Sequence, residues 1–239
     1  EGRGVHAHYV AGAEGCGLLR SVSGKPEGPY EDVQPGERMG DEIDASLFED
    51  DDGAVYFVSS AGSLAAIDAA TGQPKWVYAI EHERRFEAQG LHGYPYPRQT
   101  IPDAWDVFTS SPAVAHGKVY FGSGDGNVYA IDAKSGVLAW KFATGDVVHA
   151  SPAVAGNTVY IGSWDGRLYA IDAESGQQKW AFEAGQDPTY HNQVGFQSSP
   201  AVVDGTVYVG CRDAHVYALD AASGRKKWDY PTSKSWVNG

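Results

Sequence analysis

One internal repeat constrains the fold of this chain more than any other feature. A string of the form Ala-x-Asp-x-x-Ser/Thr-Gly-x-x-x-Trp occurs four times, ending at Trp76, Trp140, Trp180 and Trp228. Ahead of the last three copies stands the string Ser-Pro-Ala-Val, which begins at Ser111, Ser151 and Ser199. A sequence that repeats about every 40 residues folds as a row of similar units, each of which buries its apolar face against the next.

Each unit has the pattern of four short strands. Proline suits the first residue of a strand, where no ladder N–H is needed, so the first strand starts at Ser-Pro-Ala-Val. In the unit that ends near residue 143, alternating apolar residues predict three more strands, over residues 118–122, 127–132 and 137–143. Gly-rich turns separate them. Four strands in about 40 residues are typical of a β-propeller blade.

Over residues 54–230 the repeated string resembles the tryptophan-docking motif of pyrroloquinoline-quinone-type propellers. The resemblance implies that the four motif tryptophans pack against neighbouring blades. The family contains quinone-dependent dehydrogenases and also non-enzymatic propellers, such as the outer-membrane assembly lipoprotein. Its quinone enzymes hold two adjacent cysteines and a calcium ion beside the quinone, whereas the cysteines here are Cys16 and Cys211. We therefore expect no quinone and no other cofactor.

The first 60 residues do not follow the repeat. A segment that starts Gly15-Cys16-Gly17, followed by Ile43-Asp44-Ala45-Ser46 and an acidic turn at residues 50–53, resembles glycoside hydrolase family 43. That family has five-bladed propellers and acts on glycans containing arabinose and xylose. The change of family near residues 55–59 indicates a hybrid, natural or engineered, in which residues 1–60 and 61–239 form a single propeller domain.

Counting blades predicts a closed ring of five. Residues 42–80, 109–143, 149–183 and 197–230 give four blades. Within residues 6–33, three strand-like runs cover residues 8–10, 17–22 and 30–33, and residues 235–237 supply one more. The C-terminal strand is therefore predicted to complete the first blade. Closure removes exposed sheet edges and favours a monomer. The alternative is an open fragment that aggregates or pairs with a second copy.

Two insertions, at residues 81–109 and 186–197, fall on the face that surrounds the mouth of the central channel. Aromatic and polar side chains there suit a polar ligand such as a glycan, or a protein partner. The alternative is that the first insertion plugs the channel. The predicted ligand-binding residues are Arg84, Arg85, His92, Tyr94, Tyr96, Trp105, His149, Trp164, Tyr190, His191 and Asn192. Trp164 lies in the turn between the second and third strands of its unit. Arg212 and Asp213 lie in the corresponding turn of the next unit, on the same face as the insertions.

Asp44 is the one candidate catalytic residue. By resemblance it matches the family-43 aspartate that tunes the pKa of the general acid and orients it. Hydrolysis with inversion needs two carboxyl groups that flank the bond, and no further carboxylate stands at a matching position. The alternative is that Asp44 itself is catalytically inert and only forms hydrogen bonds to the backbone.

Charge and composition limit the remaining classes. Eighteen Lys and Arg against 31 Asp and Glu give a net charge of −13, which argues against nucleic acid and anionic membranes as partners. No apolar run approaches the ~18 residues of a membrane span. His6 and His8 share a strand face without a third ligand, so no metal site is predicted. Cys16 and Cys211 are expected either as two buried thiols or as a disulfide across the seam between the first and last blades.

Together these observations predict a non-enzymatic binding or scaffold propeller. The alternative function is a glycoside hydrolase resembling family 43. An engineered chimera of two propeller families, without selected activity, is a further interpretation that ranks below these two functions. The family resemblance also implies a bacterial periplasmic or secreted location.

Overall fold

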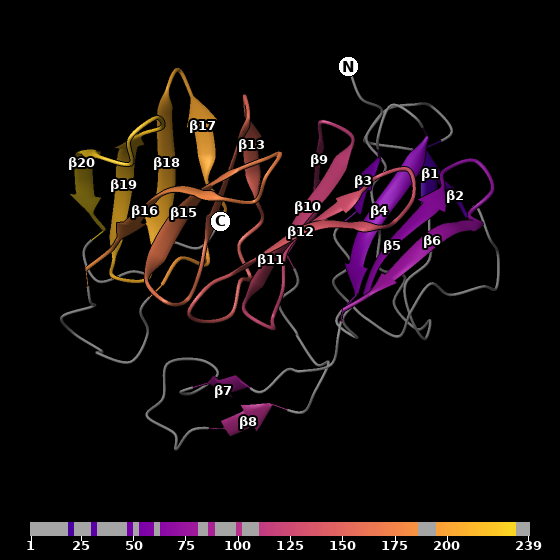
Figure 1. Cartoon of the computed structure of the whole chain (residues 1–239), viewed down its shortest axis with the longest axis horizontal. Helices are drawn as coiled ribbons and strands as arrows, with labels where there is room; N and C mark the ends of the chain where they lie inside the picture. The colour runs from indigo at the N-terminus through magenta and orange to yellow at the C-terminus, as the bar shows by residue number, and fades with distance from the viewer. Residues whose placement is uncertain are drawn as a thin grey trace.

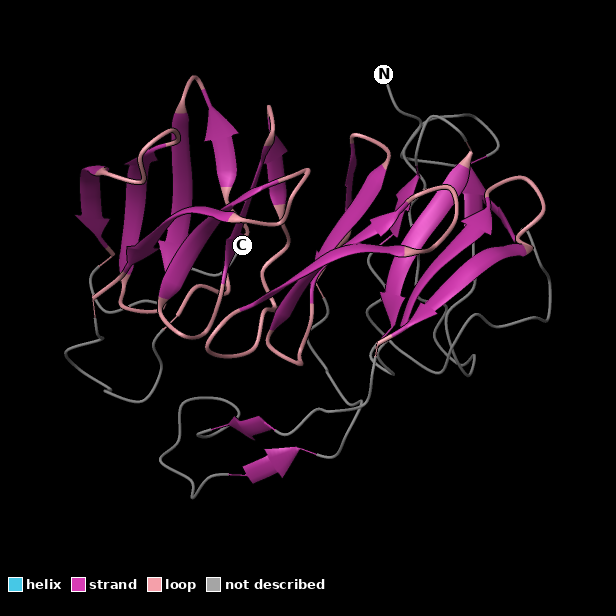
Figure 2. Cartoon of the chain, in the orientation of Figure 1, coloured by secondary structure: helices cyan, strands magenta, loops and turns pink. Residues whose placement is uncertain are grey.

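A computed structural model describes residues 19–21, 30–32, 47–49, 53–59, 63–80, 86–88, 99–101, 110–185 and 195–232. Within these ranges every regular element is a β-strand (Figure 2). No helix in these ranges is long and apolar enough to cross a membrane.

Four antiparallel sheets of four strands each make up the blades. The first holds β3 (Leu47–Glu49), β4 (Ala54–Ser59), β5 (Ser63–Asp68) and β6 (Pro74–Ala79). The second holds β9 (Ala113–Ala115), β10 (Lys118–Gly122), β11 (Asn127–Asp132) and β12 (Leu138–Ala143). The third holds β13 (Ala153–Ala155), β14 (Thr158–Gly162), β15 (Arg167–Asp172) and β16 (Gln178–Glu183). The fourth holds β17 (Ala201–Val203), β18 (Thr206–Cys211), β19 (His215–Asp220) and β20 (Lys226–Pro231).

These sheets confirm the four predicted blades and the predicted strands within them. In Figure 1 the blades follow one another across the molecule, from β3–β6 at one end to β17–β20 at the other. Each blade also has a register shift between its third and fourth strands, for example between Ala130 and Ile131 and between Ala170 and Ile171.

Two short hairpins lie outside these blades. β1 (Leu19–Ser21) pairs with β2 (Tyr30–Asp32), inside two of the runs predicted for the first blade. β7 (Phe86–Ala88) pairs with β8 (Gln99–Ile101) inside the first insertion, where no repeat pattern had indicated strands. Figure 1 shows β7 and β8 apart from the blades. Residues 8–10 and 235–237 lie outside the described residues, so five blades and a closed ring stay predictions.

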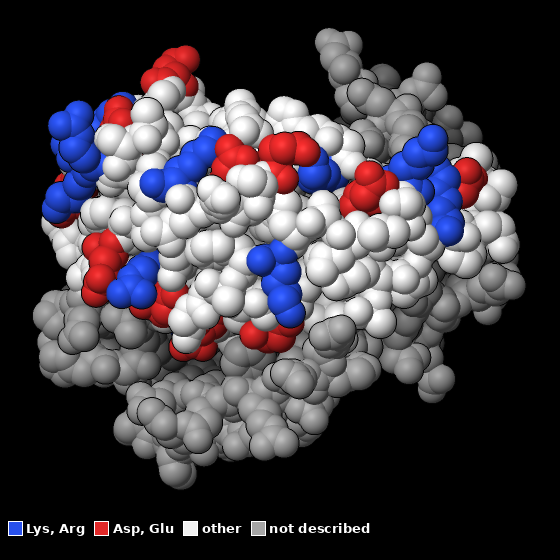
Figure 3. All heavy atoms as spheres, viewed as in Figure 1, with Lys and Arg blue, Asp and Glu red and all other residues white. Residues whose placement is uncertain are grey.

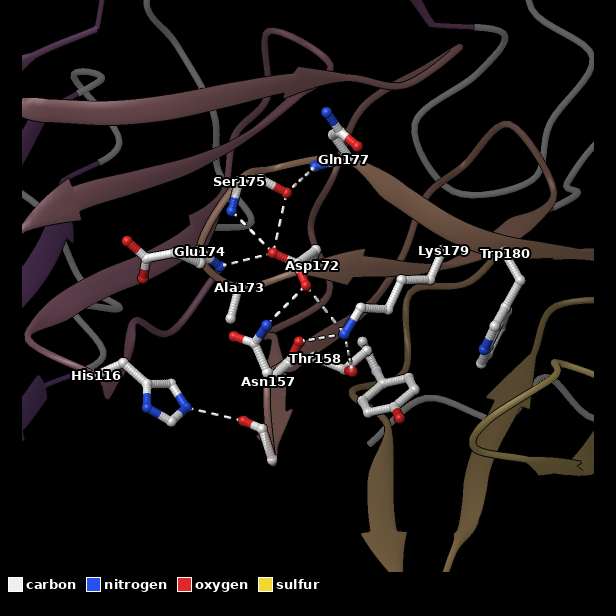
Figure 4. A network of polar contacts seen from close by, with 12 residues as sticks. His116, Asn157, Thr158, Asp172, Ala173, Glu174, Ser175, Gln177, Lys179 and Trp180 are labelled. Carbon is white, nitrogen blue, oxygen red and sulfur yellow. Dashed lines mark hydrogen bonds and ion pairs between the residues drawn. The ribbon is translucent and has the colours of Figure 1, made fainter.

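The turn between the third and fourth strands depends on the aspartate of the repeat. The carboxylate of Asp172 accepts hydrogen bonds from the backbone N–H and the hydroxyl of Ser175, both at 2.9 Å. Asn157 Nδ2 donates to the second carboxylate oxygen at 2.7 Å, and Lys179 Nζ lies 3.2 Å from it (Figure 4). The Ser175 bonds are the main reason that the pKa of Asp172 falls to about 2. Asp68, Asp132 and Asp220 hold their turns in the same way.

The seams between blades repeat one arrangement of donors and an acceptor. Trp140 Nε1 and the Tyr120 hydroxyl both donate to the carbonyl oxygen of Ala173 in the next blade, at 3.0 and 3.1 Å. Trp180 and Tyr160 donate likewise to Ala221, both at 3.0 Å. The inferred packing of the motif tryptophans against the neighbouring blade is therefore observed at these seams.

The first of these seams has the same contacts. Trp76 Nε1 and the Tyr56 hydroxyl donate to Ala133 at 2.9 and 3.3 Å. The Trp76 ring covers Gly136, and a Cβ atom at Gly136 would lie 2.7 Å from that ring. The glycine of the motif thus leaves room for the tryptophan of the preceding blade.

Trp228 departs from this pattern. It pairs with Tyr208 in the tilted geometry of the other Trp–Tyr pairs, with ring centroids 5.9 Å apart. Trp228 is nevertheless 47% exposed and Tyr208 37% exposed, whereas Trp180 and Tyr160 are 9% and 4% exposed. The outer face of the last described blade is therefore open to solvent.

The inner strands are joined by a ladder of serine contacts. The backbone N–H of Ser111 donates to the Ser151 hydroxyl at 2.9 Å, and the N–H of Ser151 donates to the Ser199 hydroxyl at 3.1 Å. The serine of each Ser-Pro string therefore links neighbouring blades, a role beyond the strand start expected from the proline.

Candidate ligand-binding site at the propeller mouth

The mouth is built where loops between blades meet turns within blades. The backbone N–H of Val148 donates to Ser123 in the preceding blade at 3.1 Å, and the N–H of Trp164 donates to Val147 at 3.0 Å. One seam later, Phe196 donates to Ser163 at 2.9 Å and Arg212 donates to Gly195 at 3.1 Å. Each connecting loop is thus hydrogen-bonded to two successive turns, which fixes the backbone positions of Trp164 and Arg212.

Close packing beneath this network depends on two glycines. A Cβ atom on Gly162 would lie 2.3 Å from Cβ of Phe196, a side chain that is fully buried. A Cβ atom on Gly195, whose φ is +123°, would lie 2.5 Å from Cα of Trp164. Only glycine permits this approach and this backbone angle. The loop therefore rests directly on the turn that carries Trp164.

Four mouth side chains meet across the seam between the last two blades. The rings of His149 and Trp164 form an edge-on pair with centroids 4.9 Å apart. The guanidinium carbon of Arg212 lies 4.1 Å from the centroid of the Trp164 ring, so the cation stacks on the aromatic face. Nη2 of Arg212 donates to Oε1 of Gln197. Sequence-predicted residues from two separate turns and a loop thus come together.

The charge of Arg212 is held away from water. Its residue is 6% exposed, and burial lowers its pKa to about 10. At neutral pH the side chain still carries its positive charge. The Trp164 ring is partly buried, and its Nε1 is a buried donor with no hydrogen-bond partner among the described residues.

These four side chains occupy only two repeat positions. Trp164 and Arg212 stand immediately before the aspartate of the turn between the second and third strands, where the preceding blade has Gly124. His149 and Gln197 each stand two residues before the serine of Ser-Pro. Gln197 was not among the predicted ligand-binding residues, although its position matches that of His149. Aligning the repeats column by column would have identified it.

The aspartates of these turns have a structural role. The Tyr169 hydroxyl donates to Asp165 at 2.6 Å, and Tyr129 and Tyr217 donate in the same way to Asp125 and Asp213. Asp213 is buried, with 1% exposure. Asp146 lies beside Asp165, and burial is the main cause that raises its pKa. Each turn carboxylate is therefore engaged by the tyrosine four residues later.

The remaining predicted site residues lie outside the described residues. They are Asp44, Arg84, Arg85, His92, Tyr94, Tyr96, Trp105, Tyr190, His191 and Asn192. Cys16 lies there too, whereas Cys211 is a buried free thiol whose Sγ lies 3.3 Å from the carbonyl oxygen of Gly195. Within the described ranges no group of three His, Cys, Asp or Glu could hold a metal ion.

The described surface carries both signs of charge. On the face shown in Figure 3, acidic and basic side chains alternate along the blades, and neither sign forms a large separate patch. The buried cation at Arg212 is therefore a local feature of the mouth within an acidic chain of net charge −13.

Comparison with known proteins identifies relatives of two kinds. The profile of the family described as outer membrane protein assembly factor BamB matches residues 96–238, more than half of the chain. The dehydrogenase subunit of a quinone alcohol dehydrogenase from Gluconacetobacter polyoxogenes is 32% identical over 93 residues, which are 39% of this chain and 11% of that protein. The β-D-galactofuranosidase xynD of Aspergillus niger is 44% identical over 64 residues, covering 24% of this chain and 19% of that enzyme.

Solved structures share the fold. BamB from Moraxella catarrhalis superimposes with a TM-score of 0.60 at 21% identity, covering 82% of this chain and 53% of that chain. Quinohemoprotein alcohol dehydrogenase from Comamonas testosteroni gives a TM-score of 0.64 at 23% identity, covering 79% of this chain and 35% of that one. The chain thus spans about half of the BamB structure, and its match spans about a tenth of the first curated dehydrogenases. These likenesses show that the chain has an all-β propeller fold.

Proposed function

The chain belongs to the family of the outer membrane protein assembly factor BamB, and from that premise we propose that it is a non-catalytic propeller that binds a protein partner at its mouth. The observation that carries the proposal is the cluster of His149, Trp164, Gln197 and Arg212. Bulky side chains occupy the two mouth positions in both of the last blades, while the remainder of each blade repeats. Trp, Tyr and Arg are the residue types that contribute most to protein interfaces.

The described carboxylates support binding over catalysis. Asp125, Asp165 and Asp213 each accept a tyrosine hydroxyl within their own blade. A glycosidase instead needs two carboxyl groups that face the substrate at a set separation. The aspartates of these turns are therefore better suited to hold the turns than to transfer protons.

A hybrid origin is part of the proposal. One chain has partial relatives among quinone dehydrogenases and in a galactofuranosidase. Residues 1–60, with their resemblance to glycoside hydrolase family 43, would then form the start of the same propeller as the repeats that follow.

The match to the galactofuranosidase also favours a second function, glycoside hydrolysis with Asp44 in the site. In that case Asp44 would orient a general acid, and a second and third carboxylate would have to come from the insertions. The experiments below therefore test both partner binding and glycoside hydrolysis.

Photo-crosslinking compares partner binding at the mouth face with binding at the opposite face of the propeller. A photoreactive residue at Arg167, which is exposed beside the mouth, should capture one discrete protein in bacterial periplasm. The same residue at Lys134, exposed on the opposite face, should capture none. An excess of unlabelled protein should abolish the first product. Equal labelling from both positions would contradict a partner at the mouth.

Activity assays with the same protein separate the two functions. We expect no turnover of aryl α-L-arabinofuranoside, aryl β-D-xyloside or aryl β-D-galactofuranoside. Turnover that is lost in the Asp44→Asn variant would overturn the non-catalytic proposal in favour of a hydrolase.

A further inference from the structure

We propose that the outer face of β17–β20 is a docking surface for a partner polypeptide that presents a further blade of the same repeat. Three exposed aromatic side chains, Tyr208, Trp228 and Tyr230, define this surface, which we call the open seam. The open seam shares no residue with the cluster at the mouth. The inference therefore goes beyond the proposed function and does not depend on it.

The first argument is the geometry of the Trp–Tyr pair. At the preceding seam the rings of Trp180 and Tyr160 lie 5.7 Å apart at an angle of 47°, and both side chains donate to the carbonyl oxygen of Ala221 at 3.0 Å. Trp228 and Tyr208 lie 5.9 Å apart at the same angle. No acceptor for either side chain is found among the described residues, and both rings are exposed. The pair thus has the geometry that binds a carbonyl oxygen of the next blade.

The second argument is an aromatic contact two residues after the motif tryptophan. Phe182 packs edge-on against Tyr217 of the next blade, with ring centroids 5.1 Å apart. Phe142 packs in the same way against Tyr169, at 5.2 Å. Tyr230 stands at the corresponding position of β20 and is exposed. Burying such a ring is favourable, so a docked blade should cover it with the tyrosine of its own third strand.

The third argument is the serine ladder at the inner strands. Ser111 and Ser151 each donate a backbone N–H to the serine hydroxyl of the next blade, at 2.9 and 3.1 Å. Ser199 accepts the second of these bonds, and its own N–H has no acceptor among the described residues. The open seam therefore lacks the same kinds of contact along its whole width, from the inner strand to the outer strand. A complete blade satisfies all of them together.

The chemistry of the open seam also restricts which partner fits. The Trp180 ring covers Gly224, where a Cβ atom would lie 2.6 Å from it, so the partner needs a glycine beneath Trp228. Residues 1–33 contain no Ala-x-Asp-x-x-Ser/Thr-Gly string, and β1 and β2 lie at the other end of the row of blades (Figure 1). The chain spans about half of the BamB structure, so a propeller of this fold can hold about twice as much chain. These observations favour a blade from another polypeptide.

The test supplies such a blade as a separate polypeptide. A second copy of residues 185–232, preceded by a protease site, is inserted between Thr232 and Ser233 of the full chain. After cleavage at that site, the copy should remain bound to the chain through size-exclusion chromatography. The match between the open seam and the described seams is the reason for this expectation.

Nuclear magnetic resonance of the indole N–H groups reports on the contact itself. The signal of Trp228 in the original unit is identified by its loss in the Trp228→Phe variant. With the copy bound, this N–H should exchange with solvent at least about tenfold more slowly than in the natural chain, because it is then buried and hydrogen-bonded. The N–H of Trp180, which is already bonded to Ala221, should exchange at an unchanged rate.

Two glycine variants, made in the copy alone, form a matched pair. Gly224 and Gly205 both have a φ of +69°, so alanine causes similar backbone strain at either position. A Cβ atom at Gly224 meets the tryptophan ring of the preceding blade, whereas one at Gly205 meets nothing within 4 Å. Gly224→Ala should therefore release the copy after cleavage and restore fast exchange at Trp228. Gly205→Ala should leave the copy bound, which separates a lost contact from a damaged blade.

Three results would overturn the inference. The first is a copy that elutes alone after cleavage, or that responds equally to both glycine variants. The second is an indole N–H of Trp228 that exchanges in the natural chain as slowly as that of Trp180, which would show that the chain covers this face itself. The third is self-association of the natural chain, lost in Trp228→Ala, which would assign the face to a second copy. Failure of the crosslink at Arg167 would count against the partner at the mouth alone.

Discussion

At the scale of single residues, aspartates stabilise this propeller through hydrogen bonds to their own turns. The pKa of Asp172 is about 2 in the folded chain, chiefly because of the bonds from Ser175, against an ordinary value of 3.8. A carboxyl group with a depressed folded pKa stabilises the fold above its unfolded pKa, and this stabilisation is lost as the pH falls toward the folded value. Asp68, Asp132 and Asp220 have pKa values lowered by the same kind of turn.

The Asp172→Asn variant should therefore unfold at a lower temperature than the wild type at pH 6. The difference in melting temperature should shrink as the pH falls from about 4 to about 2, because the wild-type carboxylate is then progressively protonated. Thermal melts followed by circular dichroism at several pH values measure this. Asp204→Asn, an exposed aspartate outside the turn motif, is the control. A difference that stays constant with pH would contradict the assigned role.

Cys211 provides a second prediction for a single side chain. Burial raises the pKa of its thiol to about 12, so almost no thiolate forms at pH 8. In a Cys16→Ser background, the native chain should react with Ellman's reagent roughly a thousandfold more slowly than the chain in denaturant. Absorbance at the released thiolate follows the reaction. Rapid labelling of the native protein would show that the loop at Gly195 leaves the sulfur accessible.

At the scale of elements, the contact of a tryptophan with a glycine joins one blade to the next. Gly136 and Gly117 both have positive φ, +71° and +68°, so alanine is strained at either position. They differ in surroundings, because a Cβ atom at Gly136 would lie 2.7 Å from the Trp76 ring and one at Gly117 would meet nothing within 4 Å.

We predict that Gly117→Ala lowers the free energy of unfolding by about 1 kcal/mol and that Gly136→Ala lowers it by a further ~1–3 kcal/mol. The additional loss of unfolding free energy in Gly136→Ala measures the cost of displacing the Trp76 ring. Chemical denaturation of the two variants, followed by tryptophan fluorescence, gives both values. If the two variants were equally stable, the contact between Trp76 and Gly136 would contribute little to the seam.

At the scale of the whole molecule, the row of blades has a docked side and an open side. Trp180 is 9% exposed and is covered by the next blade, while Trp228 is 47% exposed and belongs to the last described blade. Tyr230, on the same strand as Trp228, is 65% exposed. The outer face of β17–β20 therefore has the Trp–Tyr pair found at the other seams, but no blade among the described residues covers it.

Trp180→Ala should therefore cost about 3–5 kcal/mol of unfolding free energy, and Trp228→Ala less than about 1 kcal/mol. Equilibrium denaturation at two protein concentrations measures both. A large, concentration-dependent effect of Trp228→Ala would show that a second copy of the chain covers this face.

The repeat made most of this architecture predictable from sequence, because a motif present four times reports the same local structure four times. The strands at residues 118–122 and 127–132 were predicted with their observed bounds. The convergence of His149, Trp164 and Arg212 was expected only as residues on one face. Their contacts depend on Gly195, which lets a loop rest on the Trp164 backbone, and on Gln197 across the seam. No local pattern encodes such contacts between distant segments.

The uniform seam has a consequence for how such proteins diversify. Because every described seam joins a Trp and a Tyr to an alanine carbonyl, a seam carries no information about which blade comes next. Exchanging the last two blades would keep each joint intact yet reverse the order in which indole and guanidinium stand around the mouth. The two mouth residues of each blade would then determine what the mouth binds. Recombination of blades could change these residues without changing the rest of the fold.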